Sequence, residues 1–172
     1  MSPGPHAALL DASGATLART LADAAPVTAE TLTGFQWRGI SLGLPGVVEA
    51  LTWKTFVKVF VHEGAGATPR GWNLRIRQTG LDGPVEIIKS FGHFDIQGAP
   101  LDPRWPRGTA LLDYSPEGGP MGRVRDPLGA LDANTVLGWT YVSVAGRVLG
   151  TPSYFLLQRD RPLGADDVVP RR

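Results

Sequence analysis

The segment WNLRIR at residues 72–77 indicates the fold class, because apolar and polar side chains alternate along it. A period of two is typical of a β-strand with one face packed on a core and the other in water. Similar segments, separated by clusters of Gly, Pro, Asp or Asn, follow one another from Leu32 onward. They predict strands at 34–41, 53–62, 72–79, 84–96, 109–115, 121–126, 136–144 and 152–160.

Short strands at this spacing predict a mainly β protein with an antiparallel sheet, closed on itself or folded into a sandwich. A single barrel of about eight to ten strands is favoured, because closure removes exposed edges and leaves an interior that side chains or one small ligand can fill.

Two short helices are expected, one at 15–24 and one at 45–52. The chain divides into an N-terminal extension (1–30) carrying the first helix, a barrel domain (31–160) and a flexible C-terminal tail (161–172).

Composition excludes several classes of protein. The chain has 172 residues and a formal net charge of +1, which argues against nucleic acid as the main partner, because phosphate binding needs a basic stripe. It has no cysteine, which removes disulfides, thiol catalysis and cysteine-ligated metals. No signal peptide or membrane-spanning run is apparent, and a cytoplasmic location is expected. A homodimer is possible.

Aromatic residues fall mainly on the predicted strands, and buried Trp and Tyr need partners for their polar tips. Such rings either pack the core or line a ligand cavity. Alternate residues of the strand predicted at 136–144 form two rows, one on each face. One row contains Trp139 and Tyr141 and the other is rich in Val, and either row could face inward. The ligand-lining candidates are Phe56, Trp72, Phe91, Tyr114, Trp139, Tyr141 and Tyr154.

Two ionisable side chains are candidate acid–base groups. Tyr114 shares a small apolar row with Leu112, which predicts that it points inward and that Asp113 points outward. His93 faces inward in a regular strand, whereas a bulge at Gly92 turns it outward.

No catalytic signature such as GxSxG, HExxH, GxGxxG or a P-loop occurs. The three histidines are too far apart in sequence to predict a metal site, and no cofactor is expected. Any enzyme activity would rely on acid–base groups or on shape complementarity within a pocket.

Several segments are similar to the small bacterial GXWXG family and its companion domain of unknown function. The first motif here, GFQWRG at 34–39, is one residue longer than the family's Gly-x-Trp-x-Gly. The resemblance implies a calycin-like barrel akin to lipocalins, fatty-acid-binding proteins and nitrobindins, in which Trp37 closes the base. Barrel proteins of actinobacterial polyketide pathways are a more distant likeness. The other matching segments are GLPGVVEALTWKTF (43–56), KVF (58–60), LLDY (111–114), LDANTVLG (131–138) and YFLLQR (154–159).

These observations favour a protein that binds a hydrophobic small molecule, such as a fatty acyl chain, a polyene or an aromatic polyketide, in an aromatic-lined cavity. The alternative is a cofactor-free cyclase or isomerase of natural-product biosynthesis, in which His93 and Tyr114 are catalytic. A minor alternative is a haem barrel with His93 or His62 as the axial ligand.

Overall fold

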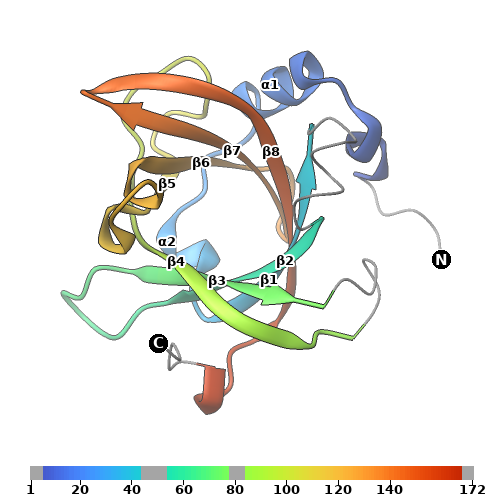
Figure 1. Cartoon of the computed structure of the whole chain (residues 1–172). Coiled ribbons are helices and arrows are strands. Elements are labelled where there is room, and N and C mark those ends of the chain that lie inside the picture. Colours follow the sequence, from blue (N-terminus) through green and yellow to red (C-terminus); the bar gives the residue numbers. More distant parts are fainter. Residues whose placement is uncertain (1–5, 44–53, 78–83, 168–172) are drawn as a thin grey trace.

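The structure, a computed structural model, describes residues 6–43, 54–77 and 84–167. Its eight strands form one closed antiparallel barrel, in which each strand pairs with its neighbours in sequence and the last returns to the first (Figure 1). The predicted fold class is confirmed. The strands are β1 (Phe35–Leu42), β2 (Thr55–Val61), β3 (Arg70–Ile76), β4 (Ile87–Gly98), β5 (Ala110–Asp113), β6 (Val124–Ala130), β7 (Thr135–Val144) and β8 (Arg147–Pro162).

Two short α-helices precede the strands, one outside the barrel and one at its end (Figure 1). Helix α1 (Gly14–Ala22) confirms the helix predicted at 15–24, and the side chain of Ser13 caps it by accepting a hydrogen bond from the backbone N–H of Thr16. The sequence reading missed α2 (Ala29–Leu32), a single turn capped by Thr28. The 3-10 turns are η1 (Ala7–Asp11), η2 (Ser115–Glu117), η3 (Met121–Arg123) and η4 (Ala165–Asp167).

The segment just before β1 closes one end of the barrel. Ala25 forms an antiparallel bridge with Ala130, and the carbonyl of Val27 accepts a hydrogen bond from the backbone N–H of Ala110. Leu32, on α2, is fully buried against the interior residues. The end of the N-terminal extension is therefore part of the barrel core.

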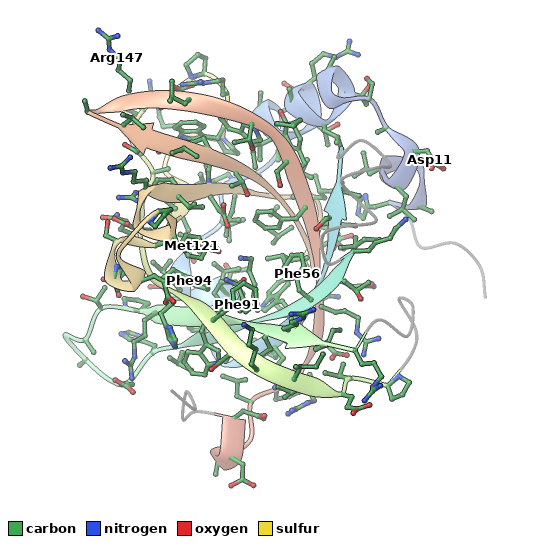
Figure 2. All side chains as sticks on the ribbon, in the orientation of Figure 1. Asp11, Phe56, Phe91, Phe94, Met121 and Arg147 are labelled. Atoms are coloured by element: carbon green, nitrogen blue, oxygen red, sulfur yellow. The ribbon has the colours of Figure 1, made fainter. Side chains whose placement is uncertain are left out.

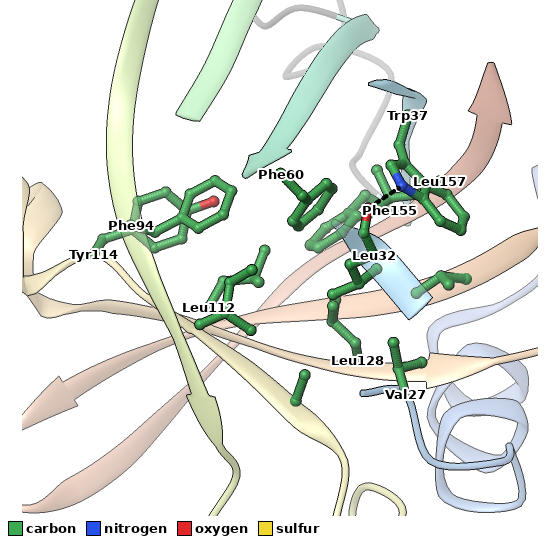
Figure 3. Packing of buried hydrophobic residues seen from close by; sticks show 13 residues of the cluster. Val27, Leu32, Trp37, Phe60, Phe94, Leu112, Tyr114, Leu128, Phe155 and Leu157 are labelled. Carbon is green, nitrogen blue, oxygen red and sulfur yellow. Dashed lines mark hydrogen bonds between the residues drawn. The ribbon is translucent and has the colours of Figure 1, made fainter. Parts of the chain in front are cut away.

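Trp37 lies at this closed end, as the family resemblance implies. Its side chain is fully buried, and the indole N–H donates to the carbonyl of Leu32 at 3.0 Å (Figure 3). The Trp37 ring packs edge-on against Phe60. The buried interior cluster consists of Val27, Leu32, Trp37, Phe60, Phe94, Ile96, Ala110, Leu112, Tyr114, Leu128, Val136, Phe155 and Leu157.

Three inward-facing phenylalanines each lie over a glycine on the adjacent strand. A methyl group at any of these glycines would overlap the phenyl ring, so the missing side chain lets the ring lie against the backbone of its neighbour. The register pairs are Gly39 with Phe56, Gly71 with Phe94 and Gly138 with Phe155.

Some predicted boundaries differ from the observed ones. The strand predicted at 121–126 begins only at Val124, because η3 occupies the preceding residues. β8 extends to Pro162, and Arg161 forms an ion pair with Asp167, so part of the expected tail contacts the barrel. The helix predicted at 45–52 lies outside the described residues.

Candidate functional site: a buried lysine inside the barrel

A lysine lies in the interior of the barrel. Strand β2 has the sequence TFVKVFV, in which the three valines pack on the outer face with Trp72, while Phe56, Lys58 and Phe60 face inward. Alternation along the strand therefore directs Lys58 toward the barrel axis. Its residue exposure is only 3%.

The Lys58 ammonium is held by side chains from other strands. It donates to Tyr114 Oη at 2.6 Å and to Asn73 Oδ1 at 2.7 Å, and it lies 3.5 Å from Asp126 Oδ2. The Tyr114 hydroxyl donates to Asp126 Oδ2 at 2.9 Å, and the Thr140 hydroxyl donates to Asp126 Oδ1, also at 2.9 Å. We call these five residues the Lys58 network.

The network connects β2 and β3 with β6, β7 and the end of β5 through the interior. Lys58 and Asp126 are both almost completely buried, and removing such charges from water costs several kcal/mol per ion. An apolar pair of similar volume often gives a fold of equal or greater stability. Stability alone therefore does not account for a charged network at this position.

Four aromatic rings surround the ammonium. The ring centroids of Phe56, Phe94, Tyr114 and Phe155 lie 5.0–5.5 Å from Lys58 Nζ. Aromatic faces attract a cation electrostatically, and the attraction is larger where water is excluded. The interior is therefore built to hold a nitrogen cation.

Burial alters the protonation of this network. Loss of hydration lowers the pKa of Lys58 from its ordinary 10.5, although the nearby Asp126 carboxylate acts in the opposite direction. Burial, followed by the charge of Asp126, raises the pKa of Tyr114 well above 10.0. Tyr114 therefore keeps its proton at neutral pH and can donate it in a hydrogen bond.

The barrel end opposite α2 carries half-buried apolar residues. Phe56, Met121 and Val124 pack against the interior cluster, and Phe91 pairs in register with Asn73, which places its side chain on the interior face. Figure 2 shows Phe56, Phe91 and Met121 around the inside of the ring of strands. These residues form an apolar rim beside the Lys58 network.

The seven predicted ligand-lining residues do not form one site, because some face the barrel interior and the others lie on its outer surface. Phe56, Phe91 and Tyr114 face the interior, and Asp113 points outward as predicted, where it pairs with Arg125. Trp72 faces the outer side of β3. The remaining three, Trp139, Tyr141 and Tyr154, pack outside the barrel with Trp105 and α1.

Strand β7 therefore presents its Val row, not its aromatic row, to the interior. Val136 belongs to the interior cluster, and Thr140 contacts Asp126, whereas Trp139 and Tyr141 lie beneath Trp105 and the helix. Gly138 on the same inward row accommodates a phenyl ring, and a larger residue would not fit there.

His93 lies on the outer face because β4 contains a bulge at Gly92, the second of the two alternatives that the sequence left open. Gly92 has a φ of +58°, and the register with β3 shifts there. His93 Nδ1 lies 2.8 Å from Glu117 Oε2, and the same oxygen accepts a hydrogen bond from the backbone N–H of His93. This backbone hydrogen bond lowers the pKa of the Glu117 carboxyl group. His93 and Tyr114 thus lie on opposite faces of the barrel wall.

An outer pocket of about 440 Å³ adjoins this histidine. Its walls include Trp72, His93, Arg70, Asp95 and Glu117, so two of the sequence-predicted residues meet there. His62 is exposed and contacts the carbonyl of Ala67. A haem inside the barrel would therefore meet neither histidine that was proposed as its axial ligand.

The sequence reading overlooked Lys58, Asn73, Asp126 and Thr140 as site residues. One signal was available: a lysine in a strand that is apolar on both faces has no polar face to occupy. The others gave no such signal. Asn73 lies in the polar row of WNLRIR, which alternation predicts to face water, and Asp126 ends the strand predicted at 121–126, where an Asp beside a turn is typical of the protein surface. Thr140 is a β-branched residue of the kind common in strands.

Comparisons with known proteins support the fold alone. No family model and no curated protein matches the chain. A solved structure, the crystal structure of a protein from Thermomonospora curvata, is similar with a TM-score of 0.51 and 20% identity, covering 86% of this chain and 87% of that one. Among the described residues, no helix has both the length and the apolar character needed to cross a membrane.

Proposed function

We propose that the barrel binds an apolar small molecule at the end opposite α2, with a carbonyl or carboxylate oxygen of the ligand directed toward Lys58 and Tyr114. The observation that carries this proposal is the Lys58 network, a set of buried polar groups beside an apolar rim. Pockets for small molecules combine mostly apolar walls with a few fixed polar groups in this way.

The geometry assigns different tasks to the two kinds of residue. Phe56, Phe91 and Met121 would contact the hydrocarbon part of the ligand, and its burial would supply most of the affinity. Lys58 and Tyr114 are the donors that would fix the orientation of its oxygen, each by exchanging its contact with Asp126 for one with the ligand. The calycin-like character implied by the family resemblance agrees with this role.

An isomerase or cyclase using the same site is the second candidate, and one observation favours it. Tyr114 accepts a hydrogen bond from Lys58 and donates one to Asp126, an arrangement that can pass a proton between substrate and protein. In this mechanism Tyr114 polarises a substrate carbonyl, while His93, on the outer face, takes no part.

The test is the identification and binding of a ligand. Freshly purified protein is extracted with organic solvent and the extract analysed by mass spectrometry, and binding of the fluorescent polyene cis-parinaric acid is then titrated. We expect an apolar ligand in the extract, saturable parinaric acid binding, and affinity about tenfold weaker in Phe56→Ala, since the variant loses roughly 1.4 kcal/mol of apolar contact.

Trp105→Phe, a change in the outer aromatic cluster, is the matched control and should bind as the wild type does. Equal binding by wild type and Phe56→Ala, or no binding at all, would refute the proposed site. Conversion of the extracted compound on incubation with fresh protein would favour the enzyme over the binding protein.

A further inference from the structure

Lys58 differs from the other lysines of the chain. The sequence contains three, and the other two, Lys54 and Lys89, are exposed. Lys58 is enclosed by aromatic rings and has hydrogen-bond acceptors on two sides. Chemistry at a buried amine can therefore be assigned to one residue without ambiguity.

The surroundings suit a nitrogen that remains cationic after it condenses with a carbonyl group. A protonated imine carries the same unit charge as an ammonium, so Asp126 would remain its counter-ion at 3.5 Å and the four rings would continue to face it. The one N–H that a protonated imine keeps would have Asn73, Tyr114 or Asp126 as acceptor.

We propose that Lys58 binds its ligand covalently, through a protonated imine between Nζ and the carbonyl carbon of an apolar aldehyde or ketone. This inference rests on the proposed function, because the carbonyl compound must first enter past the apolar rim. It identifies the ligand class more narrowly, as carbonyl compounds rather than acids or alcohols.

The groups present balance the reaction. The Lys58 ammonium gives one proton to Asp126, and the free amine adds to the carbonyl carbon to form a carbinolamine, with Tyr114 mediating transfer of a proton from nitrogen to oxygen. Asp126 then returns its proton to the hydroxyl, which leaves as water while the C=N bond forms. The net change is R–CHO plus Lys–NH₃⁺ giving R–CH=NH⁺–Lys plus H₂O.

Burial favours the first step. The lowered pKa of Lys58 makes the free amine more available at neutral pH than it is for an exposed lysine. Tyr114 and Asn73 position the nitrogen, and Tyr114 also carries the proton that the addition must move.

The experiment traps the imine by reduction. The full-length protein is incubated with dodecanal and sodium cyanoborohydride, and the intact mass and peptide map are recorded. We expect one dodecyl group per chain, located on Lys58, with little on Lys54 or Lys89. Tyr114→Phe should slow the trapping by roughly 100-fold or more, since it removes the proton-transferring hydroxyl.

Dodecanol, which lacks a carbonyl, separates failure of this inference from failure of the proposed function. If dodecanol displaces cis-parinaric acid but dodecanal labels Lys58 no faster than Lys54 or Lys89, the imine is refuted and the binding function stands. If neither compound competes for the barrel, the proposed function fails as well. Labelling that persists in Lys58→Met, or at full rate in Tyr114→Phe, also contradicts the assignment.

Discussion

Two aromatic clusters of this protein each include a cation, and they use it differently. Inside the barrel, four rings surround Lys58, which is paired with buried partners. Outside, Trp105 and Trp139 lie beside Arg104, whose side chain is 45% exposed and pairs with Asp102. A buried charge must have partners, whereas an exposed one has water.

The comparison shows that aromatic content does not locate a site. The outer cluster has the larger rings, and Trp105 stacks on Tyr141 with an interplanar angle of 2°, but these rings pack mainly on one another and on α1. The inner cluster has smaller rings and a polar network at its centre. Buried polar groups, not rings, distinguish the candidate site.

The largest expected effect is at the inner cation. Lys58→Met leaves the Asp126 carboxylate buried without its cation, which should lower the free energy of unfolding by about 3–5 kcal/mol. Lys58→Met/Asp126→Leu should be more stable than the single variant because no unpaired charge remains. Urea unfolding measures both, and equal stability of the two variants would show that the charge pair is not coupled.

A moderate effect is expected where a ring of the inner cluster lies against backbone. Gly138→Ala introduces a methyl group that overlaps the ring of Phe155, and overpacking of this kind costs about 1–3 kcal/mol. Gly98→Ala in β4 is the control, because no atom lies within 4 Å of the added methyl position. The Tm of each variant is measured by thermal unfolding. An equal fall in Tm for Gly138→Ala and Gly98→Ala would contradict the close packing inside the barrel.

The smallest effect is expected at the outer cation. Arg104→Ala removes an exposed ion pair and a contact with two indole rings, and should change the free energy of unfolding by at most about 1 kcal/mol. A loss as large as that of Lys58→Met would mean that the two cations are equivalent, and that burial is not the decisive difference.

Local patterns of the sequence predicted most of the fold. Period-two alternation and turn residues located all eight strands. The sequence left the orientation of His93 open, because Gly92 was compatible with a regular strand or with a bulge, and the structure has the bulge. The one-turn helix α2 escaped notice because four residues are too few for a helical period to appear. The start of β6 was misplaced because η3, also rich in apolar and basic residues, resembles a strand in sequence.

The candidate site was predicted less well. Tyr114 was correctly oriented because one row of β5 is small and apolar, but both rows of β7 are apolar and alternation could not decide between them. Asp126 lies on β6 and Lys58 on β2, two strands that are not neighbours in the sheet. Their side chains meet only because the sheet closes into a barrel. Pairwise contacts of this kind are not encoded in local periodicity.

The closing segment before β1 has a consequence for the order of folding. Ala25 and Val27 are made early, but their backbone partners, Ala130 and Ala110, lie about a hundred residues further along the chain, and such distant contacts form slowly. During synthesis this stretch must wait, unpaired, until β5 and β6 have emerged from the ribosome. Docking of the N-terminal segment therefore cannot precede the synthesis of Ala130 at the end of β6.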